Sequence, residues 1–345
     1  MKKSFVKIGI IIGLLLGTIA LLLLTSFSYN KYTVNKWLKN PHPPGRLVSI
    51  GSHKLYTTVK GEGSPVVIIL PGMNAFSWGW WEIQDEISKI SKIVTYDRAG
   101  YAWSEASPEP YSSKQIVTEL HTLLQRLKIE PPYILVGASM GGVYAKHFTK
   151  LYPSEVIGVV LADPSAWPER DIRDTAKQEA FALQSEKRSI NEISAAFGVF
   201  RFFGRYLLRM LRIPELQMSL TLEALSNPIQ HKNFQRHFAS IYRIDDNHYL
   251  NAPEGFPDIP VKVIVQDNEI TIRDAIRNKE IKGEKSEKKV REYLESTKER
   301  QRKDYMGLSE NCQWILAEGS GHNVQYDRPD LIIKAISNLI IEIRK

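Results

Sequence analysis

The sequence predicts an α/β protein whose core is a mostly parallel sheet flanked by helices. Short apolar runs rich in Val and Ile recur along the chain, as expected for strands buried on both faces. Segments of helical length separate these runs, for example residues 111–127 and 140–151. Strands alternating with helices are typical of a parallel sheet, in which ligands bind at the carboxyl ends of the strands.

An uncharged apolar run near the N-terminus predicts a transmembrane helix. It covers residues 8–24 and, extended to Phe27, reaches about the 20 residues needed to cross the hydrocarbon layer. The lysines before it favour a cytoplasmic N-terminus, with the rest of the protein on the outer face of the membrane. Those lysines are Lys2, Lys3 and Lys7. A signal peptide, with secretion after cleavage, is the alternative, but the run is longer than the apolar region of most signal peptides.

Composition excludes several classes of partner. The formal net charge is +8, but residues 1–40 carry six lysines and no acidic residue, so the remaining chain is nearly neutral. A nearly neutral body argues against nucleic acid binding. Cys312 is the single cysteine, which excludes an intrachain disulfide and a cysteine metal cluster. The chain has no H-E-x-x-H motif and no P-loop, so we expect no metal and no nucleotide cofactor.

Five segments are predicted along the chain. An insertion after the sixth strand is too long for a loop and contains helical patterns, so we expect a helical cap. Prolines in residues 40–46 indicate a spacer that cannot continue a helix. The predicted strands are 46–50, 53–61, 64–70, 91–97, 132–137, 156–163 and 260–266. The predicted segments are an anchor (1–28), a linker (29–46), the core's first part (47–163), the cap (164–258) and the core's second part (259–345).

Two charged segments need separate interpretations. In residues 197–214, four arginines recur every three or four positions beside an apolar face, which describes a basic amphipathic helix. Such a helix can lie on an anionic membrane; we favour a cap helix with its arginines in water and its apolar face over a pocket. The arginines are Arg201, Arg205, Arg209 and Arg212. Residues 271–304 alternate Lys, Arg and Glu, which predicts a solvated helix.

The stretch from Gly137 to Gly141 reads G-x-S-x-G, and it lies where a predicted strand meets a predicted helix. A serine on so tight a turn has a strained backbone, and glycines two residues before and after it relieve the crowding. The N-terminus of the following helix can stabilise a developing oxyanion. The pattern predicts Ser139 as a nucleophile.

A serine nucleophile requires a general base, and His322 is the best candidate. It lies in a glycine-rich loop after the apolar run 313–319, and Pro329 then opens a final helix with one apolar face. His322 also follows Ser139 in chain order on a late loop beyond a strand. The other histidines have no comparable setting.

Four motifs follow one another along the chain: LPGMN (70–74), YDRAGYAWS (96–104), GASMGG (137–142) and GSGHNVQYDRP (319–329). By these motifs, the chain from about Leu47 to its end resembles α/β-hydrolases of the lipase, esterase and proline-iminopeptidase type. The resemblance implies that Ser139 attacks an acyl carbonyl, that His322 transfers the proton, and that the backbone N–H groups of Met73 and Met140 hold the oxyanion. Pro71 and Ala102 depart from the family's usual residues without removing a catalytic group.

The carboxylate of the triad stays open between three residues. Many members of this family place it after the strand that is here 260–266, where Glu269 lies nearest the usual position and Asp267 two residues earlier. Other branches place it one strand earlier, which corresponds to Asp163, and we favour Asp163. Asp97 and Arg98 are expected to hold a loop by hydrogen bonds.

The apolar run near the N-terminus and the resemblance together predict a membrane-anchored serine hydrolase that cleaves an ester or thioester of a fairly apolar small molecule through an acyl-enzyme. A peptidase, an amidase or an acyltransferase on the same triad is an alternative. A non-catalytic binding protein that kept the fold is another.

Overall fold

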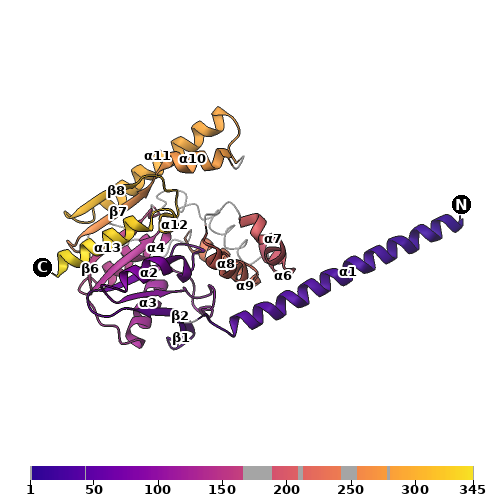
Figure 1. The fold of residues 1–345 in the computed structure, drawn as a ribbon, viewed down its shortest axis with the longest axis horizontal. Helices are drawn as coiled ribbons and strands as arrows, with labels where there is room; N and C mark the ends of the chain where they lie inside the picture. Colours follow the sequence, from indigo (N-terminus) through magenta and orange to yellow (C-terminus); the bar gives the residue numbers. More distant parts are fainter. Residues whose placement is uncertain are drawn as a thin grey trace. The chain divides into compact units, whose positions relative to one another are not determined.

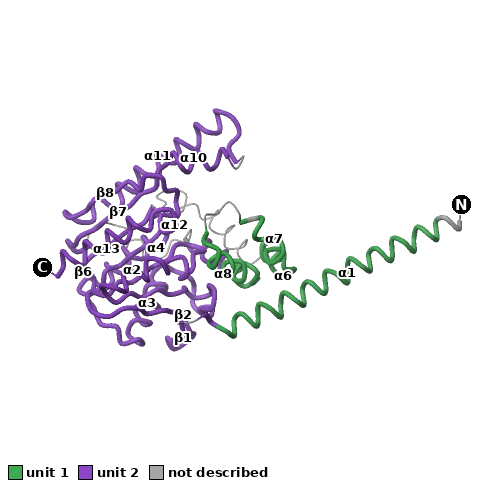
Figure 2. Tube along the Cα trace, viewed as in Figure 1, with its two compact units in different colours: residues 1–40, 187–232 green, residues 41–186, 233–345 purple. Residues whose placement is uncertain are grey.

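The computed structural model describes residues 2–42, 44–165, 189–208, 213–241, 255–277 and 280–344 (Figure 1). The chain divides into two compact units, which Figure 2 shows in different colours. One unit comprises residues 1–40 and 187–232, and the other comprises residues 41–186 and 233–345.

The larger unit is built on one sheet, which confirms the predicted α/β fold. Its strands within the described residues are β1 (Arg46–Ser49), β2 (Lys54–Lys60), β3 (Val66–Leu70), β4 (Ile93–Tyr96), β5 (Tyr133–Ala138), β6 (Val156–Ala162), β7 (Val261–Gln266) and β8 (Cys312–Ala317). These eight strands lie in the order β1-β2-β4-β3-β5-β6-β7-β8. The pairs β1–β2 and β2–β4 are antiparallel, and all the other pairs are parallel.

Helices cover both faces of this sheet. Those that lie wholly within the larger unit are η1 (Ser77–Trp80), α2 (Trp81–Ile87), α3 (Ser113–Arg126), α4 (Met140–Leu151), α10 (Asn268–Arg277), α11 (Glu284–Met306), α12 (Val324–Asp327) and α13 (Pro329–Ile343). Val66, Ile68 and Leu70 of β3 pack with α3 and α4, whereas Val67 and Ile69 pack with α2 and α13. Because side chains alternate along a strand, a strand between two helical layers must be apolar throughout.

The parallel register brings the carboxyl ends of four strands to one edge. Ala138 of β5 pairs with Ala162 of β6, which pairs with Ile264 of β7. Gln266 of β7 pairs with Ala317 of β8. The loops that follow these strands carry the candidate residues, so the register decides which of those residues can meet.

The smaller unit combines the N-terminal helix with helices of the predicted cap. It contains α1 (Lys2–Leu38), α6 (Ile190–Ala196), α7 (Val199–Leu208), α8 (Glu215–Leu225) and the first turn of α9 (Pro228–Ile241). Residues 166–188 and 242–254 of the predicted cap lie outside the described residues. The cap boundaries stay a prediction.

The predicted boundary between anchor and linker at residue 28 is not a break in the structure. Helix α1 continues to Leu38, ten residues into the predicted linker. Residues 29–38 contain no glycine or proline, so nothing stops the helix before the proline-rich segment that begins at Pro41.

The prediction that the arginines of the amphipathic helix face water is wrong for Arg201. Its guanidinium makes two hydrogen bonds to the carboxylate of Glu223, at 2.6 and 2.9 Å, and its side chain is only 14% exposed. Arg205 pairs with Glu215 at 2.5 Å. Glutamates of α8 therefore neutralise both arginines of α7. Arg209 and Arg212 lie outside the described residues.

The prediction of one solvated helix over residues 271–304 is also wrong. Two helices, α10 and α11, occupy this region, and α11 begins after Gly283, whose φ of 80° suits glycine. Leu294, Gln301 and Tyr305 of α11 are buried. One face of this highly charged helix therefore belongs to the core.

Candidate active site

Ser139 occupies a strained turn between β5 and α4. Its φ of 50° and ψ of −122° are rare for a residue with a side chain, and such strain is typical of functional positions. A Cβ atom on Gly137 would lie 2.4 Å from the Gly141 carbonyl oxygen, and one on Gly141 would lie 1.9 Å from the Leu70 carbonyl oxygen. Both positions therefore require glycine, as the turn motif predicts.

The two backbone N–H groups expected to hold an oxyanion lie on segments next to Ser139. Met140 is the first residue of α4, so its N–H has no carbonyl within that helix to bind. Gly72 packs onto the turn so closely that a Cβ on it would lie 3.1 Å from Ser139 Cβ, and Met73 follows it directly. The loop after β3 and the start of α4 thus both border Ser139.

Asp163 and His322 form a close pair at the same edge of the sheet. Asp163 directly follows β6, has a φ of 41° and is only 2% exposed. Its Oδ2 lies 2.6 Å from His322 Nδ1. Ser139 N donates to the Ala162 carbonyl at 3.1 Å, which ties the serine turn to the residue before Asp163.

The other two candidate carboxylates are engaged elsewhere. Glu269 is exposed and forms an ion pair with Arg291, and the hydrogen bond from Arg291 lowers the pKa of the Glu269 carboxyl. Asp267 accepts hydrogen bonds from Glu269 N at 3.0 Å and Gly319 N at 3.2 Å, so it organises its own loop. Of the three candidates, Asp163 is the one bonded to His322.

The environment of His322 favours its protonated form. Desolvation lowers the pKa of the imidazole, but the hydrogen bond that His322 donates to Asp163 and the negative charge of that carboxylate outweigh this effect. The pKa of His322 therefore lies above its ordinary value of 6.5. The His322 side chain is still 51% exposed. The imidazole is thus accessible from solvent while it is hydrogen-bonded to Asp163.

Three residues at this site were not predicted from the sequence. Gln301 of α11 donates from Nε2 to Asp163 Oδ1 at 3.2 Å and to the Pro164 carbonyl at 2.8 Å. Tyr305 donates to the Ser165 carbonyl at 2.8 Å, and Ser165 Oγ lies 3.2 Å from Ser139 Oγ. The spacing of Leu294, Gln301 and Tyr305 puts them on one helical face, which was the available signal for burial.

Asp97 and Arg98 support the loops around the turn. Asp97 Oδ1 accepts from Ser77 N at 2.7 Å, and Arg98 donates from Nη1 to the Pro71 carbonyl. Burial raises the pKa of the Asp97 carboxyl to about 7. Through its hydrogen bond to the Pro71 carbonyl, Arg98 holds the loop that carries Met73.

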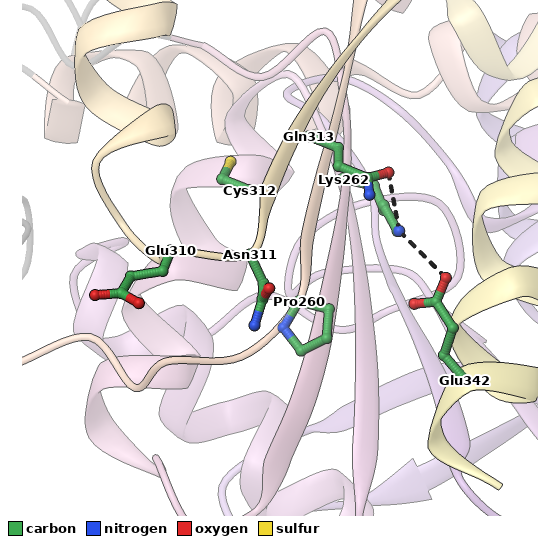
Figure 3. A pocket seen from close by; sticks show the side chains of 7 residues that line it. All are labelled: Pro260, Lys262, Glu310, Asn311, Cys312, Gln313 and Glu342. Atoms are coloured by element: carbon green, nitrogen blue, oxygen red, sulfur yellow. Dashed lines mark hydrogen bonds and ion pairs between the residues drawn. The ribbon is translucent and has the colours of Figure 1, made fainter. Parts of the chain in front are cut away.

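A pocket of about 320 Å³ lies elsewhere, at the amino ends of β7 and β8 (Figure 3). Lys262 crosses it and binds Gln313 at 3.0 Å and Glu342 at 3.6 Å. Pro260 and Asn311 precede the two strands, so this pocket is at the edge opposite to Ser139. Among the described residues, no group of three or more His, Cys, Asp or Glu side chains could hold a metal ion.

Comparison with known proteins identifies the fold family. A family model described as alpha/beta hydrolase fold matches residues 65–265. An AB hydrolase superfamily protein of Gibberella zeae is 21% identical over 306 residues, which cover 84% of this chain and 92% of that protein. The uncharacterized protein YbdG of Bacillus subtilis is 25% identical over 165 residues, or 47% of this chain. The chain spans 51% of YbdG and only 22% and 42% of two further curated relatives.

Solved structures have the same fold at low sequence identity. The Cif epoxide hydrolase from Acinetobacter nosocomialis superposes with a TM-score of 0.65 at 14% identity, covering 91% of this chain and 96% of that one. A thermophilic esterase from Thermogutta terrifontis superposes with a TM-score of 0.59 at 15% identity, covering 87% and 99%.

Gly141→Ala is expected to prevent the serine turn from forming. The added methyl would overlap the Leu70 carbonyl oxygen, so β3 and α4 would have to separate. We expect a loss of about 3 kcal/mol or more in the free energy of unfolding, measured by denaturant titration. Gly307→Ala is the matched control, because a Cβ there meets nothing within 4 Å. Equal stability of the two variants would contradict the tight packing of this turn.

Proposed function

Because the chain belongs to the alpha/beta hydrolase fold family, we propose that it is a serine hydrolase with a Ser139–His322–Asp163 triad. The observation that carries this proposal is the 2.6 Å contact between Asp163 and His322, beside a strained serine on the adjacent strand end. The proposed substrate is a carboxylic ester or thioester of a small, fairly apolar molecule.

In the first step Ser139 Oγ attacks the acyl carbon, and its proton passes to His322 Nε2. Asp163 accepts a hydrogen bond from Nδ1–H of His322. This bond fixes the tautomer and stabilises the imidazolium, and Asp163 does not take the proton. The carbonyl electron pair moves onto oxygen, where the N–H groups of Met73 and Met140 stabilise the charge.

Collapse of this intermediate breaks the ester bond, and the leaving alcohol or thiol receives the proton from His322. Water then attacks the acyl-serine, with His322 taking its proton, and the same N–H groups hold the second oxyanion. The acid leaves and Ser139 regains its proton.

We further propose that α1 anchors the protein in a membrane. Within the described residues, Phe5–Leu38 is a helix long and apolar enough to cross a membrane. Its most apolar stretch of 18 residues is not buried in the protein. With Lys2, Lys3 and Lys7 in the cytoplasm, the hydrolase unit would lie on the outer face.

Ser139→Ala and His322→Ala are each expected to reduce turnover of short-chain esters by at least about a thousandfold, because triad members act as a unit. Labelling by a fluorophosphonate should require Ser139. His121→Ala is the matched control, because His121 also pairs with a carboxylate, that of Glu155 at 3.0 Å, but is not a member of the proposed triad. Substantial turnover by purified Ser139→Ala protein would refute the mechanism.

Replacing the three carboxylates one at a time tests the acid. Asp163→Asn should lower kcat by about a thousandfold or more, with little effect on binding, because the amide supports the wrong tautomer of His322. Asp267→Asn and Glu269→Gln should stay within severalfold of wild type. A large loss confined to Glu269→Gln would assign the acid to the loop after β7 instead.

The pH profile should reflect the raised pKa of His322. The base must be neutral to accept a proton, so kcat/KM should fall on the acid side with a midpoint above 6.5. In Asp163→Asn the desolvation remains without the compensating charge, so the midpoint should move to lower pH. An identical midpoint in both proteins would contradict the Asp163–His322 interaction.

Gln301 is proposed as a positioning residue that acts through Asp163. Gln301→Met keeps the length of the side chain but removes the donor to Asp163 Oδ1. We expect kcat to fall about tenfold while KM changes little, because orientation of the base is affected and substrate contact is not. Glu299→Met, on the exposed side of α11, is the control. A change in KM alone would mean that Gln301 does not act on the triad.

Protease added to intact cells should digest the chain beyond about residue 40, because the hydrolase unit is expected on the outer face. Anchored fragments detected by an N-terminal tag would report the cut. Protection of the whole chain until the cells are lysed would reverse the proposed orientation.

A further inference from the structure

Helix α7 exposes three large aromatic side chains on one side. Phe202, Phe203 and Tyr206 are 57%, 62% and 63% exposed, respectively. Spacings of three and four residues place them together along the helix, and we call them the aromatic face. Single exposed aromatic residues are common, whereas a cluster of this kind marks an interaction surface.

The aromatic face is attached to α1 at the point where the apolar run ends. The ring of Phe202 stacks on Tyr29 with centroids 6.3 Å apart, and Phe27 contacts Phe197 at 5.8 Å. Ser26 donates to the Phe197 carbonyl at 2.7 Å.

A buried asparagine makes this attachment specific. Asn30 is 1% exposed and donates from Nδ2 to the carbonyls of Ala195, at 2.8 Å, and Ser226, at 3.0 Å. Its Oδ1 accepts from Arg201 Nε at 3.1 Å. A buried amide satisfied by three partners on other helices holds a defined arrangement. Helices α6 and α7 are therefore fixed to residues 26–30 of α1.

The length of the span then sets the depth of α7. At 1.5 Å per residue, residues 8–27 cross about 30 Å, the thickness of the hydrocarbon layer. Residues 27–30 would emerge at the boundary between acyl chains and headgroups, where Tyr and Trp are enriched. The aromatic face, in contact with Tyr29, lies in this same layer.

We propose that the aromatic face of α7 inserts into the lipid interface beside the membrane exit of α1. This inference rests on the proposed span, and its occupant is the lipid bilayer. A protein partner would have to cover the same side chains within a few ångströms of the acyl chains.

Among the described residues of α7, the attraction to lipid is apolar rather than electrostatic. Arg201 and Arg205, which a basic amphipathic helix would direct to anionic lipid, are paired with Glu223 and Glu215. Insertion of α7 should therefore change little when phosphatidylserine is added to phosphatidylcholine vesicles.

Depth measurements on the full-length chain in phosphatidylcholine vesicles test the proposal. In a Cys312→Ser background, Phe203→Cys, Leu15→Cys and Tyr293→Cys each provide one site for a fluorescent label. Leu15 reports the span, and Tyr293, 61% exposed on α11, reports a helix surface outside the smaller unit. Acyl-brominated lipid and aqueous iodide serve as quenchers, and turnover of a soluble ester shows that each labelled protein is folded.

Brominated lipid should quench the label at Phe203→Cys. Iodide should quench that label about fivefold less than it quenches the label at Tyr293→Cys. A Leu15 label in hydrocarbon with a Phe203 label in water would overturn the insertion of α7 and leave the span intact. A Leu15 label in water would overturn the span and with it the depth argument. Insertion that requires phosphatidylserine would overturn the apolar basis of the contact.

Discussion

The parallel pairing of β5 with β6 is the constraint on which the site depends. Ala138 and Ala162 are the last residues of these strands and lie side by side, so Ser139 and Asp163 leave the sheet together. Both residues adopt positive φ values, and the hydrogen bond from Ser139 N to the Ala162 carbonyl links the two turns. A shift of one residue in this register would turn either side chain away from the shared edge.

Helix α11 also stabilises this edge of the sheet, although it lies far from β5 and β6 in the sequence. Its Gln301 binds Asp163 and Pro164, and its Tyr305 binds the Ser165 carbonyl. Asp163 is almost fully buried, and a buried polar side chain requires hydrogen-bond partners of this kind. One face of the charged helix α11 is therefore exposed to water, and the other contacts Asp163, the carboxylate that is hydrogen-bonded to His322.

Within the smaller unit, polar contacts as well as apolar ones connect the N-terminal helix α1 to helices α6, α7 and α8. Asn30 makes hydrogen bonds to three other residues of this unit, and the Arg201–Glu223 pair lies directly beside it. These contacts require α1 to remain helical beyond its apolar run. They give a physical reason for the helix to continue to Leu38 rather than ending where an anchor alone would end.

The sequence by itself determined the α/β fold, the turn at Ser139 and the loop of His322, because local patterns encode buried strands, glycine-dependent turns and amphipathic helices. It left the partner of His322 open between Asp163, Glu269 and Asp267, since all three follow strands that end at one edge. The tertiary structure decided that contact through the register of β6 and β7 and the packing of α11. Likewise, only the tertiary structure paired Arg201 with Glu223 and buried Gln301, because both results depend on contacts between side chains of different elements.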